Sequence, residues 1–140
     1  MNRKAFLDTN VLIYAVAGRL TDPDEYEAAK TIIAGEEFAV SPLVLGEFLS
    51  VVRKPENELM SLADAFSWIE KWLPFCTVDI DGAIISAASA IRERYKIQFW
   101  DAAHIACAER MNIGVLYSED YNHAQQYGSV TVFNPFKAQH

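Results

Sequence analysis

The sequence predicts an α/β protein: a three-layer α/β/α sandwich with a parallel five-stranded sheet. Short apolar segments alternate along the chain with longer amphipathic ones, which is typical of strands that are connected by helices. The chain has 140 residues, of which 51% are hydrophobic and 22% are charged. It contains no internal repeat, low-complexity tract or linker, so we expect residues 1–140 to form a single domain.

Five short apolar runs are predicted to form the sheet. Each run is bounded by polar or turn-forming residues, and several of them are rich in Val, Ile or Phe. Because helical segments connect them, we expect the strands to run parallel and to be covered on both faces. The predicted strands are residues 4–7, 38–40, 76–78, 114–117 and 130–133.

The helices are predicted from apolar periodicity and from their start and stop signals. Pro23 favours a helix start, and Gly35 favours its end. Ser61 and Asp64 resemble a capping box, and Pro74 stops the helix that they open. The predicted helices are residues 11–16, 24–34, 42–52, 61–73, 81–95 and 99–111, with a short helical piece around 122–126.

Two acidic residues follow predicted strands. Asp8 comes directly after the first strand, and Asp120 comes after the fourth. Ligands of open parallel sheets bind at the carboxyl ends of the strands, so both side chains are expected at one edge of the sheet. A purely structural role stays open, because Asp8 also suits a helix N-cap and Asp120 a turn.

Two further acids lie on predicted helices. Glu47 belongs to a strongly apolar helix, and few rotations of that helix leave its carboxylate fully solvated. Asp101 lies in the first turn of its helix, where the helix dipole also favours a carboxylate. His104 follows on nearly the same helix face, and we expect it to be a hydrogen-bonded helix histidine rather than a ligand or base.

Acids from four separate segments would repel one another unless a cation compensates them. Oxygen ligands of this kind suit Mg²⁺ or Mn²⁺, and such metals promote phosphodiester hydrolysis by activating water and neutralising phosphoryl charge. A metal would also let a chain of net charge −7 bind an anionic substrate, although this charge argues against broad electrostatic binding of nucleic acid. The candidate phosphate contacts are Arg53, Lys54, Arg92, Arg94 and Lys96.

The N-terminus and the cysteines favour a cytoplasmic protein. An export signal should carry no charge in its apolar region, yet Asp8 falls there. Cys76 and Cys107 show no metal-binding spacing and are too few for a disulfide framework. The composition does not favour a membrane span.

Four short motifs occur in a fixed order along the chain. They are Phe-Leu-Asp-Thr-Asn-Val-Leu-Ile around Asp8, Ser-Pro-Leu-Val-Leu-Gly-Glu-Phe around Glu47, Trp-Asp-Ala-Ala-His-Ile-Ala around Asp101, and Tyr-Ser-Glu-Asp ending at Asp120, which runs on to Phe133-Asn-Pro-Phe. Each motif alone is weak. The ordered set spans nearly the whole chain and resembles the PIN-domain ribonucleases, most closely the VapC-type toxins of bacterial and archaeal toxin–antitoxin pairs.

The resemblance implies a metal-dependent endoribonuclease that cleaves single-stranded RNA, forms a homodimer and is inhibited by a small antitoxin. It implies that Asp8 and Asp101 bind Mg²⁺ or Mn²⁺ directly and that Glu47 binds or orients the metal or its water. Asp120 is the implied fourth acid, although the adjacent Glu119 is a rival. The residues implied to hold these ligands in place are Thr9, Asn10 and Ser118.

Three other classes of protein are alternatives to this family. A haloacid-dehalogenase-like phosphatase also begins with a strand ending in Asp, but it needs a second Asp where this chain has Asn10. A phospho-receiver module needs paired acids after the first strand and a suitably placed lysine after the last, and this chain lacks both. The serious alternative is a catalytically silent PIN-fold module that binds RNA or a protein partner.

Overall fold

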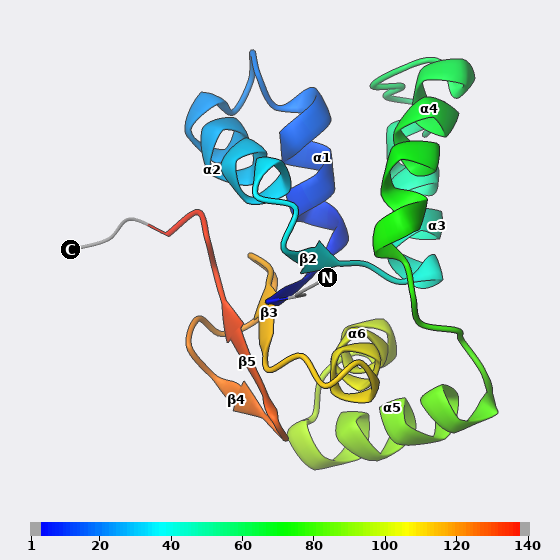
Figure 1. The fold of residues 1–140 in the computed structure, drawn as a ribbon, viewed down its shortest axis with the longest axis vertical. Coiled ribbons are helices and arrows are strands. Elements are labelled where there is room, and N and C mark those ends of the chain that lie inside the picture. The colour runs from blue at the N-terminus through cyan, green and yellow to red at the C-terminus, as the bar shows by residue number, and fades with distance from the viewer. Residues whose placement is uncertain (1–3, 138–140) are drawn as a thin grey trace.

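The computed structural model describes residues 4–137, and a five-stranded sheet lies at its centre (Figure 1). The strand order is β2-β1-β3-β5-β4. The pairs β2–β1, β1–β3 and β3–β5 are parallel, whereas β4 pairs antiparallel with β5. The predicted α/β fold is therefore confirmed, with a mostly parallel sheet. The strands are β1 Ala5–Leu7, β2 Phe38–Ala39, β3 Val115–Tyr117, β4 Gln126–Tyr127 and β5 Val130–Phe133.

Six helices and one 3₁₀ turn surround the sheet. In Figure 1 the α1–α2 pair lies on one side of the sheet, the α5–α6 pair lies on the other, and the α3–α4 pair stands beside them. Within residues 4–137 no helix is both long and apolar enough to cross a membrane. The elements are α1 Thr9–Ala17, α2 Pro23–Ala34, α3 Pro42–Val52, α4 Leu62–Trp72, η1 Leu73–Phe75, α5 Gly82–Tyr95 and α6 Phe99–Arg110.

The core forms where the central strands meet these helices. Every residue of β1 is buried, because β1 lies between β2 and β3 with helices on both faces. The helices contribute apolar side chains with no exposed surface, such as Leu12, Phe48 and Ile105. Burying one such side chain contributes about 1.5–3 kcal/mol to folding. This packing fixes the positions from which α1, α3 and α6 present their polar residues.

The predicted strand at 76–78 is wrong. Only Cys76 pairs with the sheet, through an isolated bridge to Val40. The preceding residues form the 3₁₀ turn η1, and the Cys76 amide closes that turn by bonding the Leu73 carbonyl. Asp81 then caps α5, so the segment between is too short to continue along the sheet.

The predicted helical piece around 122–126 is also wrong, because the chain there leads into strand β4. Tyr127 is buried between the rings of Tyr95 and Tyr121, which fixes this strand against the core. Gly128 has a positive φ of 62°, which allows a two-residue turn into β5. A Gly-Ser pair between short apolar runs is a recognised hairpin signal, and this signal was missed.

Two serines cap helices α3 and α4. The Ser41 hydroxyl accepts a hydrogen bond from the Val44 amide at 3.2 Å, and Ser61 does the same for the Asp64 amide at 3.1 Å. Ser41 is completely buried, whereas Ser61 is exposed. The two caps have the same geometry and differ mainly in burial.

We expect Ser41→Ala to destabilise the protein more than Ser61→Ala. The first change leaves the Val44 amide without a partner in the interior and should cost about 1–2 kcal/mol, whereas water can replace the second cap at a cost of about 0.5–1 kcal/mol. Equilibrium urea denaturation of both variants measures the difference. Equal losses would show that burial does not strengthen the Ser41 cap.

Candidate metal centre

Asp8 connects the sheet to the first helix. It follows β1, and its Oδ1 accepts a hydrogen bond from the Thr9 amide at 2.7 Å, so it is the N-cap of α1. Its side chain is nevertheless almost completely buried, with 4% of the residue exposed. The Ser118 hydroxyl donates to the second carboxylate oxygen at 2.7 Å. Asp8 is therefore a helix cap and, at the same time, a buried carboxylate at the sheet edge.

A hydrogen-bond network brings Asp120 to the same edge. Ser118 directly follows β3, the neighbour of β1, and its hydroxyl accepts bonds from the Asn10 side chain at 3.2 Å and the Asp120 amide at 3.1 Å. The Asn10 amide group also donates to the Asp120 carboxylate at 3.1 Å. The segments after β1 and β3 are thus linked through the Ser118 hydroxyl and through the direct bond from Asn10 to Asp120.

Glu119 has a different partner. The Tyr14 hydroxyl lies 3.0 and 3.1 Å from the two oxygens of the Glu119 carboxylate. Asp120 instead belongs to the network around Ser118 and Asn10. This arrangement supports Asp120 as the fourth acid of the site.

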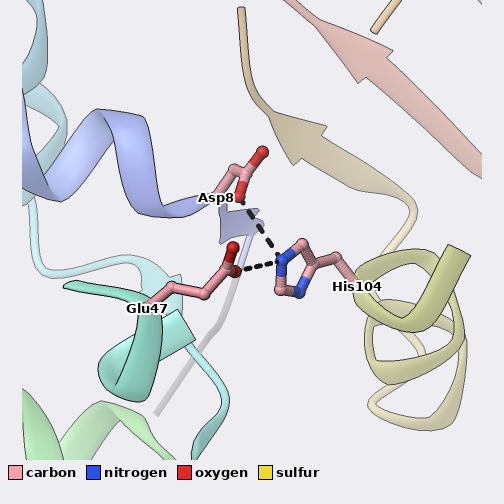
Figure 2. Close-up of side chains that lie close together, drawn as sticks. All are labelled: Asp8, Glu47 and His104. Atoms are coloured by element: carbon pink, nitrogen blue, oxygen red, sulfur yellow. Dashed lines mark hydrogen bonds and ion pairs between the residues drawn. The ribbon is translucent and has the colours of Figure 1, made fainter. Parts of the chain in front are cut away.

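Glu47 reaches the site from α3 and meets His104 from α6 (Figure 2). His104 Nε2 lies 2.7 Å from Glu47 Oε1 and 3.6 Å from Asp8 Oδ1. The Thr9 hydroxyl donates to the same Glu47 oxygen at 3.2 Å. Ligand atoms of Asp8, Glu47 and His104 all lie within 4.8 Å of one another. Three elements far apart in the sequence therefore contribute to one cluster.

Asp101 is close enough to the other acids for their charges to affect its pKa. It lies in the first turn of α6, and burial together with the charge of Asp8 raises its pKa to about 6. The charges of Asp120 and Glu47 also contribute to this raised pKa, while the charge of His104 opposes it. Burial likewise raises the pKa of Asp8, against the effects of His104 and Ser118. The acids are close enough to disfavour one another's ionisation.

His104 is the counter-charge that this cluster contains. Burial lowers its pKa, but the hydrogen bond to Glu47 and the charges of Asp8 and Glu47 outweigh that effect, so the pKa is raised. The bond to His104 is the largest cause of the lowered pKa of Glu47. Among residues 4–137, none of the four acids forms an ion pair with a lysine or an arginine. Even with His104 protonated, the four carboxylates would leave the cluster with excess negative charge.

The predicted phosphate contacts lie outside this cluster. Arg53 pairs with Glu58 at 3.2 Å, and its guanidinium also bonds the Met60 carbonyl. Lys96 lies 3.5 Å from Glu93, and Arg94 lies over the Tyr95 ring. Within the part of the chain that the structure describes, neither Lys54 nor the Arg92 side chain forms an ion pair or a hydrogen bond with the four acids. A role of these five residues in phosphate binding stays a prediction.

The donor set fits a divalent metal ion. Carboxylate oxygens dominate it, as Mg²⁺ and Mn²⁺ prefer, and the excess negative charge calls for a cation. The buried Asn10 Oδ1 has no hydrogen-bond partner among the described residues, although the same side chain donates to Ser118 and Asp120. A metal ion or its water would satisfy this oxygen. A separate hollow of about 550 Å³, whose lining includes Ile32 and Phe133, contains none of the four acids.

The sequence predicted a hydrogen-bonded helix histidine at His104 and gave no sign of two tyrosines near the site. His104 is hydrogen-bonded as expected, and its partner Glu47 comes from another helix. Tyr121 donates to the backbone carbonyl of Asp101 at 2.8 Å, which ties the loop after β3 to α6. Tyr121 follows Asp120 in the sequence, whereas Tyr14 lies in an apolar segment with no acid beside it.

The sequence profile of the PIN domain matches residues 5–128, which is most of the chain. The chain belongs to the PIN domain family. The predicted resemblance is thereby confirmed, and the acids of this PIN domain occupy the carboxyl ends of β1 and β3 and the two helices that flank them. No curated protein sequence matches the chain significantly.

Solved structures share the PIN fold over nearly the whole chain. A toxin–antitoxin complex from Klebsiella pneumoniae has a TM-score of 0.70 and 21% identity, covering 96% of this chain and 100% of that one. FitAcB from Neisseria gonorrhoeae has a TM-score of 0.65 and 19% identity over 96% and 99%. VapC20 from Mycobacterium tuberculosis, a toxin that cleaves the sarcin–ricin loop, has a TM-score of 0.67 and 20% identity over 85% and 92%.

We expect Asp101→Asn to stabilise the metal-free protein. The raised pKa means that the folded state disfavours the Asp101 carboxylate, a penalty that is fully present above pH of about 6 and disappears as the pH falls toward 3.8. Because Asp101 is only half-buried, solvent screening reduces the gain to about 1 kcal/mol. Urea denaturation in a chelator at pH 8 and pH 4 measures it. A gain that is the same at both pH values would contradict this account.

Proposed function

We propose that this PIN domain is a Mg²⁺- or Mn²⁺-dependent endoribonuclease that hydrolyses RNA phosphodiester bonds as the toxin of a toxin–antitoxin pair. The observation that carries the proposal is the buried Asp8 carboxylate, which shares one site with Glu47, Asp101 and Asp120 while His104 is its single counter-charge. Membership of the PIN domain family supports the same reaction class. A cation in the site would remove the repulsion among the acids.

Asp8 and Asp101 would hold the metal directly, with Asp120 beside them. When bound, the metal lowers the pKa of a water molecule and neutralises negative charge on the phosphoryl oxygens. Ser118 fixes one oxygen of Asp8 and the amide of Asp120, and Asn10 fixes the Asp120 carboxylate. Such partners orient ligands before the metal binds, which increases affinity.

Glu47 is suited to orienting the attacking water. Its Oε1 is held by His104 and Thr9, which restricts the rotation of the carboxylate. About half of the side chain is exposed (47%), so it borders the surface from which a substrate arrives. A carboxylate that is fixed at one oxygen can accept a proton from water or direct it with the other.

Neutralisation by a small antitoxin and homodimerisation complete the proposal. The solved structures that share the fold include toxin–antitoxin complexes. The α4 region of this chain exposes several large apolar side chains, which is typical of a protein-binding surface. They are Leu62, Phe66 and Leu73, each with between 45% and 52% of its surface exposed. A toxin of this kind would act on RNA in the cytoplasm.

We expect Ser118→Ala to weaken metal binding by about 10- to 100-fold, because Asp8 and Asp120 lose the hydroxyl that orients them. Mn²⁺ affinity measured by isothermal titration calorimetry tests this. The matched control is Ser67→Ala, which removes an exposed hydroxyl on α4 and should leave the affinity unchanged. Unchanged affinity in Ser118→Ala would show that the network around Asp8 does not support a metal.

The activity itself is tested with purified protein, Mn²⁺ and RNAs that contain unpaired loops. Wild type is expected to cleave, and Asp8→Asn and Asp101→Asn are expected to lose about 100-fold or more in rate, since each removes a metal ligand. Asp64→Asn on exposed α4 is the control and should cleave normally. Equal cleavage by wild type and both site variants would rule out the proposed metal site.

A different result would favour the silent binding module. If purified wild type cleaves no RNA but its expression still arrests growth, the PIN domain acts by binding RNA or a partner. If growth arrest is lost in Asp8→Asn together with cleavage, the toxin assignment is supported. A small protein that restores growth and forms a complex with wild type would identify the antitoxin.

A further inference from the structure

A second pocket adjoins the carboxylate cluster on the other side of Glu47. It has a volume of about 380 Å³, within the range of about 300–1,000 Å³ that is typical of small-molecule sites. Its walls combine apolar surface with one hydroxyl and one carboxylate. The lining residues are Pro42, Leu43, Gly46, Glu47, Ser50 and Trp100.

Trp100 is the distinctive residue of this pocket. It is 54% exposed, which is unusual for so large an apolar side chain away from a binding surface. Phe99 packs edge-on against it, with ring centroids 5.1 Å apart and an interplanar angle of 83°. This contact restrains the indole at the start of α6, where it is positioned to stack on a planar group.

The pocket and the carboxylate cluster are built from consecutive residues. Trp100 precedes Asp101 on α6, and Gly46 precedes Glu47 on α3. In each pair, the first residue lines the pocket and the second belongs to the acidic cluster. A nucleotide has the same arrangement, because its base and its phosphate are separated by one sugar.

Gly46 keeps the pocket open. A Cβ atom at this position would meet no heavy atom within 4 Å, so internal packing does not require glycine. Glycine inside a helix costs about 0.5–1 kcal/mol relative to alanine. Glycine at position 46 therefore lowers the stability of the helix and leaves room for a ligand in the pocket.

We propose that this pocket binds one unpaired nucleobase of the RNA, stacked on Trp100, with an adjoining phosphate at the acidic cluster. The proposal rests on the proposed ribonuclease function and adds a reason for selectivity. A base inside a duplex is stacked on its neighbours and cannot enter, so the pocket selects single-stranded RNA. Ser50 also lines the pocket, and its hydroxyl can bond the edge of the base.

Stacking is tested by RNA binding in an Asp8→Asn background, which blocks cleavage. Fluorescence anisotropy with labelled eight-nucleotide unpaired RNAs should show about tenfold weaker binding for Trp100→Ala, the loss expected for one stacked base, and near-parental binding for Trp100→Phe. Gly46→Leu should weaken binding similarly by filling the pocket. Leu20→Ala, which removes an apolar side chain that is 90% exposed and outside the pocket, is the control and should bind normally.

An abasic scan makes the test independent of the variants. Removing the base at one position of the RNA should weaken parental binding about tenfold, and Trp100→Ala should show no further loss with that RNA. An equal effect at every position, or unaltered binding by Trp100→Ala and Gly46→Leu, would overturn the pocket. If these variants instead convert a dimer to a monomer in light scattering while the scan shows no special position, a second copy of the chain covers it.

This experiment is separate from the test of ribonuclease activity. Cleavage by wild type with no special base position would leave the proposed function intact and refute the pocket. A special base position that depends on Trp100, without cleavage by wild type, would support the pocket and refute the nuclease.

Discussion

The burial of the Asp8 carboxylate is the constraint on which the rest of the site depends. A buried carboxylate is costly unless hydrogen bonds and a positive charge stabilise it. The Thr9 amide and the Ser118 hydroxyl supply the bonds, and His104 supplies one charge. Because these partners come from α1, the loop after β3, and α6, the strand order that places β1 next to β3 is a requirement of the site.

His104 gives the metal-free site a partial balance of charge. Its imidazole lies closer to Glu47 than to Asp8, at 2.7 Å against 3.6 Å, so its main ion pair is with Glu47, whose side chain is 47% exposed. Asp101 has no such partner, and its pKa is raised. The negative charge that His104 does not compensate is thus greatest at Asp8 and Asp101, the two residues proposed to bind the metal directly.

Local rules in the sequence predicted most of the fold, because helix starts and stops depend on neighbouring residues. Asp8, Ser41 and Ser61 all cap the helices that follow them. Strand β4 was not predicted because its two residues, Gln126–Tyr127, are too few to show a period. Its formation also depends on contacts of Tyr127 with distant aromatic rings. The pairing of His104 with Glu47 likewise joins residues 57 positions apart and depends on how α3 and α6 pack.

The two edges of the sheet limit how other chains can approach this protein. The edge strands β2 and β4 contain two residues each, so neither offers a row of free backbone groups long enough to pair with an added strand. Short edges of this kind also protect against edge-to-edge aggregation. Partner recognition by an added strand is therefore disfavoured at both edges, which favours recognition through side chains.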